Sequence, residues 1–236
     1  MRLVVLTTGS VRRRYFVKAL QNVFPVTQVF IETGELTPPF ETAHPLDDAC
    51  RNHENEVWFA GAAPDFDHVA EVERFESLND SKCVEAIAAT KPNVVLVFGA
   101  GLLRPPVLDI CPNGCVNLHS GDPESYRGLD CHLWAVYHGD FAALVTSLHR
   151  IAPEIDAGDV VAKRPVTLAP GMSLHELRRA HTEGCVEVVT GALTDFAATG
   201  AFQATPQNRR GRYYSFMPAA IKDQCIRRFE RHTATL

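Results

Sequence analysis

Long hydrophobic runs are absent from this sequence. None approaches the roughly eighteen consecutive apolar residues that a membrane-spanning helix requires. The N-terminus, MRLVVLTTGSVRRRYF, has an apolar run too short for a secretory signal peptide, and its cluster of arginines at 12–14 follows that run instead of preceding it. We therefore expect a cytoplasmic protein with no membrane partner.

Paired cysteines and an excess of positive charge are also lacking. The seven cysteines are an odd number without a Cys-x-x-Cys pair, which favours reduced thiols over a disulfide framework. Cys111, Cys115 and His119 are close in sequence, but no fourth ligand stands nearby, so we expect no metal. The net charge of -5 argues against a nucleic-acid partner, although arginines cluster at 12–14 and 209–212.

Alternating strand and helix patterns indicate an α/β fold. Residues 3–6 form a short β-rich run, a Thr-Gly-Ser turn follows, and residues 11–23 carry apolar side chains at helical spacing. The run NVVLVFG, residues 93–99, is apolar on both faces, as expected for a central parallel strand covered by helices. We predict a doubly wound, mostly parallel, Rossmann-like sheet whose ligands gather outside the carboxyl ends of the strands.

The other predicted elements set the domain boundaries. Further strands are predicted at 26–32, 144–151 and 159–168, and another strand ends near residue 119. A loop is predicted at about 33–49. Helices are predicted within 49–62, 77–92, 127–140 and 173–200. We assign residues 1–200 to one catalytic domain. Residues 201–236 are a short C-terminal extension, packing on or beside that domain, with one short helix at most.

Asn117 and His119 end a predicted strand. Because side chains alternate along a strand, the two point to the same face. An amide can donate to a carbonyl oxygen that becomes negatively charged, and an imidazole can relay a proton at neutral pH. The pair suits acyl transfer to an amine, although Asn-x-His at a strand end also occurs as a turn with a surface histidine.

A carboxylate would complete such a site. Glu154, Asp156 and Asp159 share the loop between two predicted strands, and Asp156 is preferred because Ala157 and Gly158 make a tight turn that could aim its side chain. An Asp before Ala-Gly is also an ordinary turn residue.

Other polar residues receive structural interpretations. Most of His132, His138, His149, His175 and His181 are assigned to solvent-facing or hydrogen-bonded structural roles. The stretch GAGLLR, residues 99–104, lacks the third glycine of a dinucleotide-binding fingerprint and does not follow the first strand.

Several motifs in order give the chain a family resemblance. Asn117-x-His119, then Tyr126-Arg127-Gly128, then Val145-Thr146 with the following LHRI, then Ile155-Asp156-Ala157-Gly158 with the following Asp-Val-Val span about residues 90–170. This series resembles the formyltransferase family that uses 10-formyltetrahydrofolate, so the fold would be a Rossmann-like formyltransferase core. The series of motifs is specific for the formyltransferase superfamily, but it gives little information about which substrate receives the formyl group.

The resemblance implies roles for individual residues. Asn117 would hold the charge that develops on the formyl oxygen, His119 would stabilise it and move a proton, and Asp156 would orient His119 and assist proton removal from the amine. The donor would lie against two walls, lined by Gly101, Leu102, Leu103 and Arg104 and by Ile151, Glu154 and Ile155. One departure concerns residues 120–125, Ser-Gly-Asp-Pro-Glu-Ser, where the family usually has a Pro-Ser-Leu-Leu-Pro-like loop, so the acceptor side could be altered.

The formyl acceptor is the finer prediction. About 36 residues follow Gly200, fewer than the appended barrel domain of initiator-tRNA formyltransferases needs. Gln207 and the segment 211–214, Gly-Arg-Tyr-Tyr, resemble the tail of sugar N-formyltransferases, so we predict a nucleotide-linked amino sugar. The acceptor-binding candidates are Gly9, Ser10, Arg12, Arg127 and Tyr213.

Alternative functions remain open at this point. They are formylation of glycinamide ribonucleotide, hydrolysis of 10-formyltetrahydrofolate, and non-catalytic folate or nucleotide binding. In each case the partners are small molecules, and a homodimer is considered beside the monomer.

Overall fold

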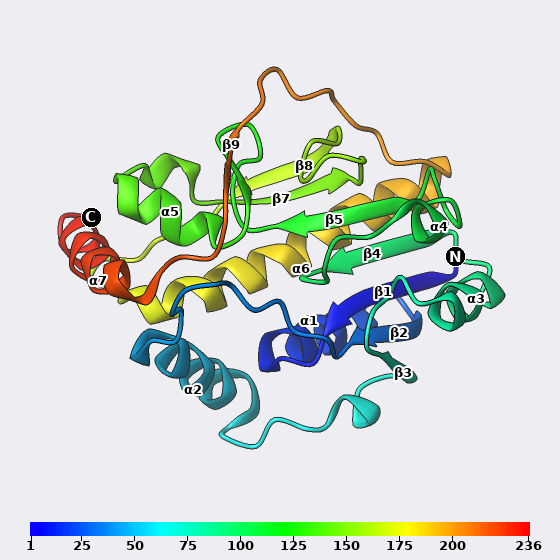
Figure 1. Ribbon diagram of the computed structural model, residues 1–236, viewed down its shortest axis with the longest axis horizontal. Helices are drawn as coiled ribbons and strands as arrows, with labels where there is room; N and C mark the ends of the chain where they lie inside the picture. The colour runs from blue at the N-terminus through cyan, green and yellow to red at the C-terminus, as the bar shows by residue number, and fades with distance from the viewer.

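A seven-stranded sheet forms the centre of the computed structural model, which describes residues 1–236. Its strand order is β3-β2-β1-β4-β5-β7-β8 (Figure 1). The strands are β1 (Leu3–Thr8), β2 (Val26–Glu32), β3 (Val72–Phe75), β4 (Val94–Phe98), β5 (Cys115–His119), β7 (Val145–Arg150) and β8 (Val160–Pro165). The first five pair in parallel, whereas β7 and β8 are antiparallel to their neighbours. The prediction of a doubly wound, mostly parallel sheet is confirmed.

Helices cover both faces of the sheet and close the end beyond β5. They are α1 (Val11–Gln21), α2 (Pro45–Phe59), α3 (Ser81–Ala89), α4 (Pro105–Leu108), α5 (Cys131–His138), α6 (Leu174–Thr199) and α7 (Ala219–Thr233), with short 3-10 turns at Phe66–His68 and Phe141–Ala143. Figure 1 shows α6 running along the sheet and α7 packing beside α5.

Alternation along the strands explains how the two faces are filled. In β1, Leu3 and Val5 pack with α1 and α6, while Val4 and Leu6 pack with α3 and α4. The central strand β4 is buried along its whole length, as its apolar sequence predicts. No helix combines the length and apolar character of a membrane span.

Several element boundaries differ from those predicted. Helix α2 begins at Pro45, inside the predicted loop, because His44 and Asp47 form a capping box that starts it earlier. Strand β3 was not predicted, since it has four residues and no fully buried side chain. The tail contains a 15-residue helix, α7, which is longer than expected.

A second, two-stranded sheet involves the tail. Strand β6 (Tyr126–Gly128) pairs in parallel with β9 (Arg212–Tyr214), which the sequence did not reveal. Met217, Cys225 and Phe229 then enter a hydrophobic cluster with α2, α5 and α6. The C-terminal segment is therefore built into the core and also approaches the end of β5.

Candidate functional site

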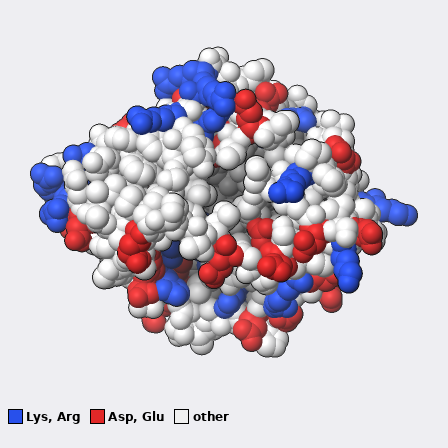
Figure 2. All heavy atoms as spheres, in the orientation of Figure 1, with Lys and Arg blue, Asp and Glu red and all other residues white.

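Strand β5 presents Asn117 and His119 on one face. Val116 and Leu118 point the other way, into the hydrophobic cluster that contains α6. His119 is 5% exposed and Asn117 is half-buried. Figure 2 shows a hollow near the centre of the visible face, over the end of β5. The predicted Asn-x-His pair thus lies at the carboxyl end of a sheet strand, where ligands of this architecture bind.

The carboxylate of Asp156 joins these side chains. Its Oδ2 accepts a hydrogen bond from the Gly128 N–H at 2.7 Å and lies 3.4 Å from His119 Nδ1. Its Oδ1 accepts from Asn117 Nδ2 at 3.4 Å. Of the three predicted loop carboxylates, Asp156 is the one that the fold brings to the pair. Glu154 instead points outward and pairs with Arg210.

Two glycines permit this arrangement. A Cβ on Gly158 would lie 1.8 Å from the Arg150 carbonyl oxygen, so the turn after Asp156 needs glycine to pack against β7. Gly128 has φ +94° and approaches the Tyr214 backbone, and this conformation directs its N–H at Asp156. Asp156 itself adopts φ +50°, which a residue other than glycine keeps only when its surroundings hold it.

His149 is a member of the site that sequence reasoning missed. Its Nε2 lies 3.4 Å from Asp156 Oδ1 and 3.3 Å from Asn117 Nδ2, and its ring is 2% exposed. The antiparallel pairing of β7 with β5 places it directly opposite Asn117. The Val-Thr-x-x-His spacing can be seen in the sequence, but it does not show that His149 lies opposite Asn117. The prediction of a structural role for His149 did not consider this pairing of strands.

The His119 ring lies between two acceptors. Nε2 is 2.9 Å from the Tyr126 carbonyl oxygen, and Nδ1 faces Asp156. Both nitrogens are satisfied only in the imidazolium form, but burial opposes that charge and is the largest effect, so the pKa of His119 is lowered. A neutral imidazole that gains a proton readily when negative charge appears nearby suits proton transfer at neutral pH.

Asp156 keeps its charge. Burial alone would raise the pKa of Asp156, but His119, the hydrogen bond and charge of His149, and the Gly128 N–H together lower that pKa well below its usual range. The site therefore holds one fixed negative charge in contact with two imidazoles. It can orient His119 and stabilise a proton that arrives there.

The two predicted donor-binding walls meet beside this site. Leu103 and Ile151 pack in the same hydrophobic cluster. The Gly101 N–H donates to Glu32 at 2.6 Å, and Asn79 donates to the Leu102 carbonyl and accepts from the Arg104 N–H. These contacts fix the loop 99–104, and Leu102 and Ile155 remain exposed, one on each wall. Their role in donor binding stays a prediction.

The acceptor candidates come from several elements. Gly9 and Ser10 precede α1, and the Ser10 side chain caps no backbone group. Tyr213 is half exposed, and its ring lies against Gly128. Arg12 and Arg127 have shielded guanidinium nitrogens without partners.

The C-terminal segment also holds the Asp156 turn. Gln207 Nε2 donates to the carbonyl oxygens of Asp156 at 2.9 Å and Gly158 at 2.8 Å. Thr205 bridges to Val160, and Arg209 donates to the Glu124 carbonyl in the loop after His119. The C-terminal segment thereby contacts both loops that border the site, the turn at Asp156 and the loop after His119.

Gln207→Ala is expected to lower kcat by about 10–100-fold, because the turn that carries Asp156 loses two hydrogen bonds and the carboxylate shifts relative to His119. Steady-state rates and donor KM would be measured together, and the KM should change little. Gln203→Ala, in the same segment but exposed, is the control. Equal rates for the two variants would contradict a positioning role for Gln207.

Buried histidines make the fold sensitive to acid. Burial lowers the pKa of His181 to about 3, and the positive charge of Arg12 adds to the effect. The folded state then resists protonation, so its stability is full above pH 6.5 and falls as pH drops toward 3. His119 and His132 have lowered pKa values too and act in the same direction.

We expect the free energy of unfolding of the wild type to fall by about 3 kcal/mol or more between pH 7 and pH 4. Urea titrations across this range measure it. His181→Asn should flatten the slope, whatever its effect on stability at pH 7. An unchanged slope in that variant would show that His181 is not a source of the acid sensitivity.

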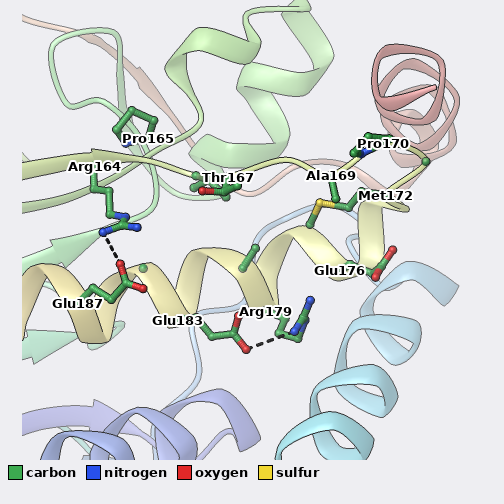
Figure 3. Close-up of a pocket in the computed structure, with 14 residues that line it drawn as sticks. Arg164, Pro165, Thr167, Ala169, Pro170, Met172, Glu176, Arg179, Glu183 and Glu187 are labelled. Atoms are coloured by element: carbon green, nitrogen blue, oxygen red, sulfur yellow. Dashed lines mark hydrogen bonds and ion pairs between the residues drawn. The ribbon is translucent and has the colours of Figure 1, made fainter. Parts of the chain in front are cut away.

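A separate pocket lies elsewhere on the molecule. It has a volume of about 450 Å³ and lies between α6 and the segment that connects β8 to α6 (Figure 3). Arg164 pairs with Glu187 and Arg179 with Glu183 along its wall. None of Asn117, His119 and Asp156 borders it. Because the pocket is separate from these three residues, we assign it no part in the site.

Comparison with known proteins identifies related sequences. A family model described as formyl transferase matches residues 36–192. A methionyl-tRNA formyltransferase of Desulfotalea psychrophila is 31% identical over 113 residues, which cover 46% of this chain and 35% of that protein. The chain spans between about a third and a half of the length of the curated relatives it matches.

Solved structures share the fold. A 4-N formyltransferase from Francisella tularensis superposes with a TM-score of 0.60 at 16% identity, covering 91% of this chain and 76% of that one. The formyltransferase PseJ from Anoxybacillus kamchatkensis, solved with UDP-4,6-dideoxy-4-formamido-L-AltNAc and tetrahydrofolate, gives 0.54 at 15% identity, covering 90% and 85%. At these identities the likeness establishes a common architecture.

Proposed function

The chain belongs to the formyl transferase family, and from this premise we propose that it transfers a formyl group from 10-formyltetrahydrofolate to a primary amine. One observation carries the proposal. Asp156 is 39 positions from Asn117 in the chain, and the fold brings its carboxylate within 3.4 Å of both Asn117 and His119 at the end of β5. All three fall inside the segment that matches the family.

These side chains match the needs of the reaction. The amine nitrogen bonds to the formyl carbon, the bond from that carbon to the folate nitrogen breaks, and the proton lost by the amine ends on the folate nitrogen. The Asn117 amide is a donor for the charge that develops on the formyl oxygen. His119 accepts the proton from the amine and passes it on toward the folate nitrogen, and Asp156 stabilises the imidazolium that forms in between.

The donor walls fit a folate. The backbone of residues 101–104 is held rigid by Glu32 and Asn79, so its amides and carbonyls are preorganised. The exposed side chains of Leu102 and Ile155 offer apolar surface for a planar ring. We assign donor binding to these two walls.

We further propose a nucleotide-linked amino sugar as the acceptor. The half-exposed Tyr213 ring lies against Gly128, whose N–H contacts Asp156, so an aromatic surface stands beside the reacting groups and could stack on a nucleobase. The likeness to PseJ, solved with a formylated UDP-sugar and tetrahydrofolate, supports this choice.

A panel experiment tests both levels of the proposal. The protein is incubated with 10-formyltetrahydrofolate and amino-sugar nucleotides, glycinamide ribonucleotide or methionyl-tRNA, and products are identified by mass. A formylated amino-sugar nucleotide is expected. Formylation of another amine alone would overturn the acceptor. Tetrahydrofolate formation without any amine would indicate a hydrolase, and folate binding without turnover would indicate a binding protein.

A further inference from the structure

Arg127 in β6 is a buried cation without a partner. The residue is 5% exposed, its Nε and Nη1 are shielded from solvent, and neither makes a hydrogen bond. No carboxylate forms an ion pair with it. Lys222, the other cation buried to this degree, contacts Asp47 at 2.9 Å, and the partly buried Arg178 contacts Glu54 at 2.6 Å. Arg127 is therefore an exception that requires an explanation.

The position of Arg127 ties it to the site. The carbonyl of the preceding residue, Tyr126, lies 2.9 Å from His119 Nε2, and the N–H of the following residue, Gly128, donates to Asp156 at 2.7 Å. Both neighbours of Arg127 in the chain thus contact the reacting groups. On the adjacent strand β9, its partner is Tyr213.

A buried guanidinium without hydrogen bonds lowers the stability of the fold, and an apolar side chain of similar size would avoid that cost. No hydrogen bond to its shielded nitrogens and no ion pair offsets the cost. An anion that binds only with the substrate would do so, since a guanidinium matches the oxygens of a phosphoryl group in a planar, two-pronged geometry.

Other unpartnered groups on neighbouring elements strengthen this interpretation. Arg12 Nη1 and His132 Nδ1 are also shielded and without hydrogen bonds. Burial lowers the pKa of His132, and the positive charges of Arg12 and Arg178 lower it further. Arg12 and Arg127 are thus two cations with shielded nitrogens that lack an acceptor, and an anionic ligand would supply acceptors.

We propose that Arg127 binds a phosphoryl group of the acceptor, so that the amine which this protein formylates belongs to a phosphorylated compound. This inference rests on the proposed formyl transfer and specifies its acceptor side. The donor's carboxylates are the other source of negative charge, and the test separates the two.

The central experiment compares Arg127→Met with Arg178→Met, using inorganic pyrophosphate as the probe. Thermal unfolding of the wild type should shift upward with pyrophosphate. Arg127→Met should unfold at the wild-type temperature or above without ligand, because an unpaired buried charge is removed, and should lose the pyrophosphate shift. Arg178→Met should unfold at a lower temperature, because Glu54 is left buried and unpaired.

Steady-state kinetics distinguish an effect of Arg127 on acceptor binding from an effect on donor binding. With the acceptor found in the panel, Arg127→Met should raise the acceptor KM by about 10–100-fold and leave the KM for 10-formyltetrahydrofolate unchanged. Arg127→Lys, which keeps the charge but not the two-pronged geometry, should give a smaller rise and serves if the Met variant does not fold.

Each of several results would overturn the proposal. They are a pyrophosphate shift absent from the wild type or retained in Arg127→Met, a loss of stability in Arg127→Met as large as in Arg178→Met, and a rise in donor KM in place of acceptor KM. Efficient formylation of an uncharged amine would also reject it while the proposed transfer stood. Absence of transfer to every amine would instead reject the proposed function.

Discussion

Replacing Asp156 by Asn is expected to lower kcat by about 10³–10⁴-fold, the largest effect of any single change in the chain. The carboxylate is the one negative charge in contact with both His119 and His149, and it accepts the Gly128 N–H. An amide of the same size removes the charge that stabilises an imidazolium and turns one acceptor into a donor. Initial rates of tetrahydrofolate formation at saturating donor and amine measure the loss.

Asp159→Asn is the matched control for this variant. Asp159 lies three residues further along the same loop, and its side chain makes no hydrogen bond or ion pair in the structure. It should retain wild-type rates. If Asp156→Asn folded normally and stayed within tenfold of the wild type, Asp156 would not be part of the reacting group.

Asn117→Ala is expected to lower kcat by about 10²–10³-fold, as removal of one donor to a developing oxyanion does elsewhere. The apolar neighbours Val116 and Leu118 point into the opposite face, so β5 should stay in place. The KM for the donor should change little, because the amide acts on charge that appears during the reaction.

Asn113→Ala, in the exposed turn before β5, is the control for Asn117→Ala. It should leave kcat and both KM values unchanged. A rise in donor KM with kcat preserved in Asn117→Ala would place the amide in ground-state binding and contradict its assignment to the oxyanion.

The pair Asn117 and His119 could be predicted from local rules. Strand alternation puts both on one face, and the apolar run before them marks the strand. Asp156 could be singled out because the Ala-Gly that follows permits a tight turn, and Gly158 indeed packs against the Arg150 carbonyl. Each of these inferences depends on a few consecutive residues.

His149 could not be predicted in the same way. Its place depends on the register by which β7 lies antiparallel to β5, and sequence spacing does not define that register. A histidine in an apolar strand has the same local pattern whether it faces Asn117 or the core.

The tail was underestimated for a related reason. Strands β6 and β9 have three residues each and form only by pairing with each other across a long separation in the chain. The bonds from Gln207 to the Asp156 turn likewise depend on the assembled fold. The unpaired state of Arg127 is visible only when every neighbour is in place.

The most direct test of the account is amine-dependent formation of tetrahydrofolate from 10-formyltetrahydrofolate, measured for the wild type and for Asn117→Ala, His119→Ala and Asp156→Asn side by side. The account predicts rapid formation by the wild type, coupled one to one to formylated amine, and a loss of at least about a hundredfold in each variant that still binds folate. Undiminished turnover in all three variants would contradict it, because the chemistry would then lie elsewhere in the molecule.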